Sequence, residues 1–130
     1  MLTDIEIKDI VYDYISESNL AKSVSGKITK RKRTEAGKED VAISILSNNN
    51  EQLQKALVNV NIYVQDIKEG SSMTENTPRL RELSRIASEV LNRHNGGEWR
   101  WELEQQREIA SESTNEHVIN NRLKFQYANI

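Results

Sequence analysis

The chain has 130 residues, a formal net charge of −2 and no cysteine. Leu, Ile, Val and Phe make up about a quarter of it, more than in chains that stay disordered, so we expect one folded domain over residues 1–130. The lack of Cys excludes disulfides, thiolate catalysis and thiolate metal sites. An acidic first segment and the lack of a membrane-length apolar run predict a soluble intracellular protein without membrane contact.

Residues 3–19 predict an amphipathic helix. Apolar side chains recur at three- and four-residue spacing between Ile7 and Ile15. Thr3 followed by Glu6 is the pattern of a capping box, in which each side chain bonds the other residue's backbone N–H. Ser18 and Asn19 are stop signals, although the helix could continue for a few residues.

A strongly basic segment follows. Residues 22–38 hold seven bases against Glu35, a balance of +6, whereas residues 1–21 have a balance of −4. Clustered cations attract phosphates or acidic protein surfaces. A solvated loop with no partner is the alternative interpretation. The candidate binding residues are the six cations of this loop: Lys27, Lys30, Arg31, Lys32, Arg33 and Lys38.

Two alternating segments predict strands. Gly26 precedes a short stretch over 27–30, and the alternation over 39–47 indicates a strand with one apolar face, followed by a turn at 48–50. Residues 57–65 have the clearest strand pattern, with four branched aliphatic residues on one face and Asn59, Asn61 and Tyr63 on the other. The amides suit hydrogen bonding across a subunit contact, and solvent exposure explains them equally well.

The polar stretch 66–77 predicts a loop, and Thr77 with Pro78 predicts the start of a second amphipathic helix that runs to about Asn92. Residues 95–97 (Asn-Gly-Gly) are expected to terminate that helix.

Strands are predicted from Trp99 to about Ala110 and from His117 to Tyr127, joined by a turn at 111–115. The alternating Trp99 and Trp101 could stack on nucleic-acid bases, but aromatics in this pattern are more often core. The order of elements predicts an α+β fold: an antiparallel or mixed sheet with two amphipathic helices on one face and a C-terminal β-hairpin. The core is thin for the length, which favours contacts with further subunits.

Residues that could support catalysis are few. The two histidines are His94, expected at a helix end, and His117, beside Glu116. Neither belongs to a patterned set of metal ligands, and the Gly pair follows a helix where a phosphate loop would precede one. We therefore expect no enzyme activity, no metal and no cofactor. A small hydrolase using His117 with Glu116 is a minor alternative.

Four features appear in a recognisable order. Gly26 and Lys27 lead into a strand, the basic loop precedes Glu39 and Asp40, a Val-Asn-Val-Asn-Ile-Tyr-Val run fills 58–64, and Glu116 with His117 precedes the last strand. In this order the chain resembles the small tail completion proteins of tailed phages and prophages, the tail terminator or head-tail joining class.

The resemblance implies a structural virion protein of α+β fold. Its copies would assemble in the host cytoplasm into a ring, typically a hexamer, that caps the tail tube in the neck of the virion, contacts the head-tail connector and encloses a channel for DNA. The basic loop would then face the lumen, the tail tube or a neighbouring subunit, and residues 70–77 would be a second contact loop. The alternative is a nucleic-acid-binding module that uses the same six cations and loses affinity as salt rises.

Overall fold

The computed structural model describes residues 1–129, apart from the side chain of Glu112, and has an α+β fold, as predicted. Its helices are α1 (Asp4–Ser16), α2 (Asn19–Ser23) and α3 (Thr77–Leu91), with a single 3-10 turn at Glu112–Thr114. The main sheet contains, in spatial order, β1 (Ile28–Thr29), β2 (Val41–Asn49), β3 (Leu53–Gln65), β8 (Glu116–Ala128), β7 (Trp99–Ser111) and β6 (Arg93–Asn95). A separate hairpin is formed by β4 (Ile67–Glu69) and β5 (Ser72–Thr74).

The sheet is antiparallel except at one edge, where β1 runs parallel to β2. Strands β3 and β8 pair along their whole length, from Leu53 opposite Ala128 to Gln65 opposite Glu116. Strand β8 also pairs with β7, so the predicted C-terminal hairpin is confirmed. These three long strands form the centre of the molecule.

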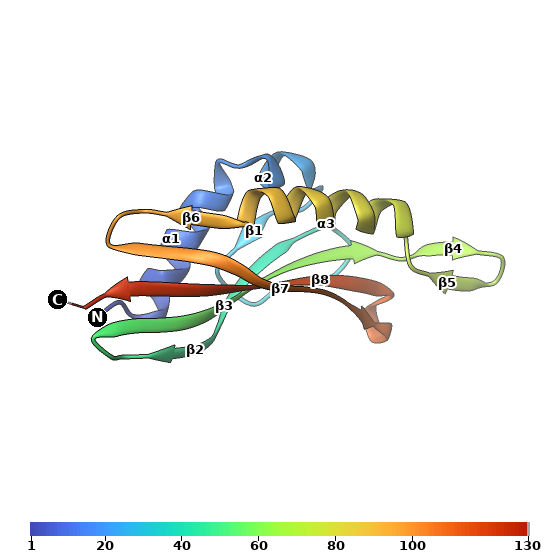
Figure 1. Cartoon of the computed structure of the whole chain (residues 1–130). Coiled ribbons are helices and arrows are strands. Elements are labelled where there is room, and N and C mark those ends of the chain that lie inside the picture. Colours follow the sequence, from blue (N-terminus) through green and yellow to red (C-terminus); the bar gives the residue numbers. More distant parts are fainter. Residues whose placement is uncertain (130) are drawn as a thin grey trace.

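The core lies between the sheet and the helices, which all cover the same face of the sheet (Figure 1). Strand β3 buries alternate residues from Val58 to Val64, as its sequence pattern predicts. Against them pack the apolar stripes of α1 and α3, and the largest core side chains are Trp101 and Phe125. The opposite face of the sheet carries no helix, and we call it the uncovered face. Its central residues are Asn59, Asn61, Tyr63, Val118, Asn120 and Arg122.

The first predicted helix is two helices. Thr3 and Glu6 form the expected capping box, with the Thr3 hydroxyl accepting from the Glu6 N–H at 3.3 Å. Helix α1 ends at Ser16, and the chain starts a second short helix with Ser18 as its N-cap. Ser18 is therefore both the stop signal that was expected and a new start, which places three helices on the covered face in place of two.

The ends of the second predicted helix differ from the prediction. The N-cap of α3 is Asn76, whose side-chain oxygen accepts from the Arg79 N–H at 3.3 Å, so Thr77 is already helical. At the other end α3 stops at Leu91, and residues 95–97 do not terminate it. They build the turn between β6 and β7, where Gly97 has a φ of +95°. Glycine favours a tight hairpin turn and a helix end for the same conformational reason, so the sequence did not distinguish them.

Strand boundaries were partly wrong. Strand β2 begins at Val41, and it includes Asn48 and Asn49, which pair with β3 residues where a turn was expected. The polar stretch 66–77, predicted as a loop, contains the β4–β5 hairpin. Its two-residue turn has Gly70 at a φ of +64°, which fits the first central position of a type II′ turn. We call residues 67–74 the arm, because this hairpin projects from one end of the body (Figure 1).

Candidate functional site

The basic loop (residues 27–38) crosses the edge of the sheet and reaches the uncovered face. Arg33 lies at this crossing, with its guanidinium carbon 3.9 Å from the ring centroid of Tyr63. Tyr63 belongs to the uncovered face of β3, so the loop shields one end of that face and leaves the centre open. Stacking of this kind uses the planar Arg guanidinium, which a Lys side chain does not provide.

Arg33 is held by two carboxylates. Its Nη1 and Nη2 donate to the two oxygens of Glu116 at 2.8 Å each, and its Nε donates to Asp40 at 3.1 Å. Glu116 is only 1% exposed and also accepts from the Gln65 amide at 2.8 Å. The hydrogen bonds from Arg33 lower the pKa of Glu116 to about 2. Arg33 therefore fastens the loop to the sheet and is not free to contact a ligand.

A second ion pair ties the base of the loop to α3. Arg79 Nε and Nη2 each donate to Glu39 at 2.7 Å, and these bonds lower the pKa of the Glu39 carboxyl. Gly26 sits beside this pair, with its N–H donating to the Glu39 carbonyl at 3.1 Å. A Cβ at Gly26 would lie 2.6 Å from the backbone nitrogen of Asp40, so the close approach of the two segments requires glycine.

The six predicted cations divide into two groups. Arg33 is paired as described, and Lys30 donates to Asp9 at 2.8 Å while lying 4.8 Å from the ring centroid of Tyr12. The balance of +6 counted from the sequence therefore overstates the charge that the loop can offer to a partner. The other four are exposed and form no ion pair with the side chains that the structure describes: Lys27, Arg31, Lys32 and Lys38.

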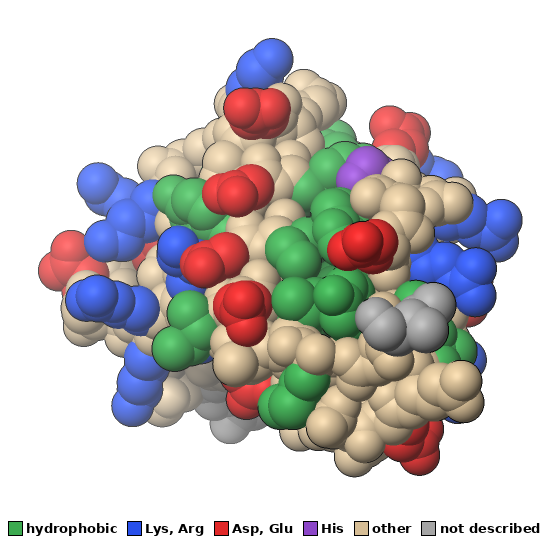
Figure 2. Space-filling view, turned by 90° about the vertical axis from the view of Figure 1, so that its left-hand side faces the viewer, with side chains coloured by type: hydrophobic (Ala, Val, Ile, Leu, Met, Phe, Trp, Pro, Cys, Tyr) green, Lys and Arg blue, Asp and Glu red, His purple; other side chains and the backbone are tan. Residues whose placement is uncertain are grey.

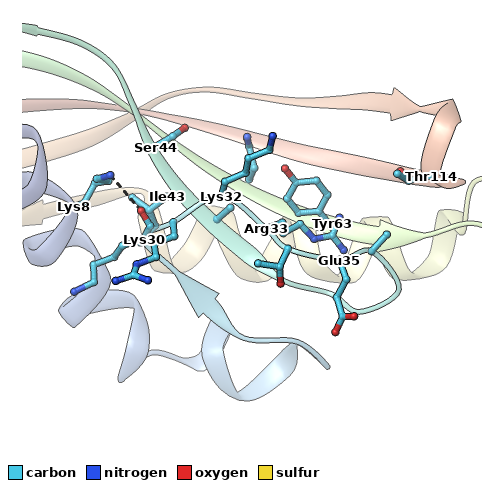
Figure 3. A pocket seen from close by; sticks show the side chains of 14 residues that line it. Lys8, Lys30, Lys32, Arg33, Glu35, Ile43, Ser44, Tyr63 and Thr114 are labelled. Atoms are coloured by element: carbon cyan, nitrogen blue, oxygen red, sulfur yellow. Dashed lines mark hydrogen bonds between the residues drawn. The ribbon is translucent and has the colours of Figure 1, made fainter.

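A groove of about 630 Å³ runs between the basic loop and the uncovered face (Figure 3). Cations of the loop, including Lys32, line one wall, and Ser44, Asn61 and Tyr63 line the other. Lys8 of α1 closes one end, where its Nζ donates to the Lys30 carbonyl at 3.2 Å. Cations facing hydroxyls and amides suit the binding of acidic or hydrogen-bonding groups of a macromolecule.

Amide side chains continue the polar surface along the uncovered face. The Asn120 amide donates to Asn61 at 2.7 Å and to Asn59 at 3.2 Å. Next to them Arg122 buries its Nε without a hydrogen-bond partner among residues 1–129. Val118 is half-buried on the same face, so apolar and polar groups alternate over it. The sequence placed Asn59, Asn61 and Tyr63 here correctly, but Asn120 and Arg122 were missed because only strand register brings them alongside.

Of the two histidines, His117 lies at the start of a strand, as predicted, whereas His94 does not lie at a helix end. His117 Nδ1 is 2.7 Å from Asp66 Oδ1, and Glu116, the residue before it on the strand, points to the opposite face. The pairing of His117 with Glu116 in the hydrolase hypothesis is therefore wrong. His94 belongs to β6, and its ring centroid lies 4.2 Å from that of Tyr14 and 5.0 Å from that of Trp101. Trp101 is buried, which confirms the core interpretation for this residue.

Within residues 1–129, no group of three or more described His, Cys, Asp or Glu side chains could hold a metal ion. No helix in that range combines the length and the apolar composition needed to cross a membrane. A scan against protein-family models found no match, and a search of curated protein sequences found none either. The resemblance to phage tail completion proteins therefore stays a prediction.

Proposed function

We propose that the chain is a structural subunit of a phage tail, a tail terminator or tail completion protein whose copies form a ring at the head-tail junction. Its partners would be the end of the tail tube and the head-tail connector, with DNA passing through the ring. It would assemble in the host cytoplasm, act in the tail or neck of the virion and catalyse no reaction. The observation that carries the proposal is the uncovered face, bordered by a loop that is rigidly fastened.

The uncovered face has the composition of a protein contact. Antiparallel sheets often leave one face to water, so the missing helix layer alone decides nothing. Here, however, Val118 and Tyr63 are interspersed with amides, and Arg122 buries a donor that has no partner in the described chain. Interfaces that form after folding combine apolar, aromatic and Arg side chains with hydrogen-bonding groups in this way. A protein seated on this face would supply the missing acceptor.

The fastened loop favours protein contact over DNA contact as the main role. Two of its six cations, Lys30 and Arg33, are neutralised by carboxylates of the same chain. Arg33 also holds the loop against the sheet, so it cannot contact DNA. The outer side of α1 meanwhile exposes acids, among them Asp4 and Asp13. Opposite charges on different surfaces of one molecule favour contacts between unlike surfaces of neighbouring copies, the type of contact from which rings are built.

The test uses tail tubes of the parent phage. Replacing Asn61 and Val118 with Arg adds charge and bulk to the uncovered face, and Arg81→Glu on the exposed side of α3 is the matched control. We expect the wild type and the control to sediment with the tubes and the double variant to lose at least about tenfold in affinity, because two central contacts are replaced. A folded double variant that caps tubes as well as the wild type would contradict the proposal.

Nucleic-acid binding is the second candidate, supported by the four exposed cations beside the groove. If only Lys27, Arg31, Lys32 and Lys38 meet phosphates, the logarithm of the DNA affinity should fall against the logarithm of salt with a slope no steeper than about −4. Charge reversal of Arg31 and Lys32 should reduce the slope by about two. Unchanged DNA binding in that variant would exclude this candidate.

A further inference from the structure

The arm exposes two large apolar side chains. Ile67 is 44% exposed and Met73 is 46% exposed. Ile67 pairs with Thr74 and Met73 with Lys68, so the two apolar side chains stand on opposite faces of the two-stranded ribbon. No residue of the arm is buried. A hairpin of two strands without a core is marginally stable in water, so the arm gains most from packing against another surface.

The opposite end of the molecule holds a matching surface. There the N-terminal segment is hydrogen-bonded to the ends of β2 and β3 beside their turn: the Leu2 N–H donates to Gln54 at 2.8 Å, and the Asn48 amide donates to Asp4 at 2.8 Å. Seen end on, this side gathers hydrophobic side chains in its middle, beside a row of acidic ones (Figure 2). We call it the apolar end. The segments that these bonds join carry four large exposed apolar side chains, between 37% and 67% exposed: Met1, Ile5, Leu46 and Leu53.

The arm cannot reach the apolar end of its own chain, because the two lie at opposite ends of the body (Figure 1). A second copy can bring them together. We propose that the arm of one copy packs onto the apolar end of the next copy through the face that carries Met73 and Lys68. The proposal rests on the ring function and names the two surfaces that join neighbours in it.

The geometry of this contact sets the form of the assembly. The contact joins two different surfaces, so each copy has one arm to offer and one apolar end to fill. Repetition of such a contact gives a closed ring when the rotation between copies divides the full turn. The charges agree with the contact, because Lys68 shares the Met73 face of the arm and the acids Asp4 and Glu6 flank Ile5 on α1. The uncovered face stays open for a different partner.

Two variants each disrupt one of the two contacting surfaces, the arm or the apolar end. The arm variant carries Lys68→Glu and Met73→Ser, which change the contacting face of the arm, and the end variant carries Ile5→Ser and Leu46→Ser. Ile109→Ser is the matched control, since Ile109 is 45% exposed but lies on β7, outside both surfaces. By sedimentation velocity, each double variant should weaken self-association by at least about tenfold, while the control behaves as the wild type. Urea unfolding checks that all three remain folded.

Mixing the two variants is the decisive experiment. The arm variant keeps an intact apolar end and the end variant keeps an intact arm, so an equimolar mixture should form a one-to-one dimer that grows no further. Failure of the mixture to associate, or wild-type association by either variant alone, would overturn the proposal. If the wild type forms rings and the arm variant forms them too, the proposed arm contact is wrong but the ring function is not. If the mixed dimer forms but the wild type never closes into rings, the arm contact is supported and the ring function is wrong.

Discussion

Arg33 is the residue on which the shape of the basic loop depends. Its guanidinium joins Glu116 and Asp40, which are 1% and 7% exposed. Removing a cation from such a site leaves buried carboxylates without a partner, which costs far more than the loss of a surface ion pair.

We predict that Arg33→Ala lowers the free energy of unfolding by about 3 kcal/mol. Arg31→Ala, two residues away at an exposed position without an ion pair, should change it by less than about 0.5 kcal/mol. Urea unfolding of both variants measures the difference. Equal small effects would mean that the loop is not fastened to the sheet through Arg33.

Glu116 makes the fold sensitive to acid. Its pKa is about 2 in the folded chain against an ordinary value of 4.5, mainly because Arg33 donates to the ionised form. A lowered folded-state pKa stabilises the protein above pH 4.5, and that stabilisation is lost as the pH falls from about 4.5 to about 2. The loss should approach about 3 kcal/mol.

The control for this pH dependence is Glu116→Gln. The variant should be less stable than the wild type at pH 7 and should lose less stability between pH 5 and about 2, since it has no carboxylate to protonate there. Urea unfolding at a series of pH values gives both curves. Parallel curves would assign the acid sensitivity to other groups.

The pairing of Arg33 with Glu116 could not be predicted from the sequence. The two residues are 83 positions apart, and Arg33 sits in a run of similar cations. The sequence identifies the run of cations. It does not identify the cation that pairs with Glu116, because the position of Glu116 depends on the strand register that places it opposite Gln65. The adjacent acids Glu39 and Asp40 were the only local signal that part of the loop's charge would be neutralised.

At the scale of elements, regular periodicity predicted the helices and strands well, whereas turn residues predicted the boundaries between elements poorly. The alternation in β3 and the helical spacing in α3 matched the burial that the structure has. The errors fall where one residue type serves two structures: Gly96 and Gly97 form a hairpin turn, and Gly70 forms the turn of the arm. The two short strands within residues 66–77 were not predicted, because neither strand buries a side chain and the segment therefore shows no alternation of apolar and polar residues.

The arm should matter for assembly and little for stability. Replacing residues 67–74 with a Gly-Gly link, which spans the distance between paired strands, is expected to change the free energy of unfolding by less than about 1 kcal/mol, because no buried contact is removed. Chemical denaturation of the shortened chain checks this. A loss of several kcal/mol would show that the arm is part of the core.

At the scale of the whole molecule, the composition and the architecture agree. A sheet covered on one face needs one apolar layer, which is why a chain with 36% hydrophobic residues can fill its core. The remaining surfaces are distinct: an uncovered face rich in amides, a loop with four exposed cations, an arm and an apolar end. The sequence predicted the first two in outline, whereas the last two became visible only when distant segments were placed in space.

The central claim is that copies of this chain form a closed ring. Negative-stain imaging of the purified wild-type protein tests it most directly, with particles classified by rotational symmetry. The account predicts rings with one fixed number of copies around an open channel. Particles that remain monomers at millimolar concentration, or that grow only into open filaments, would contradict it.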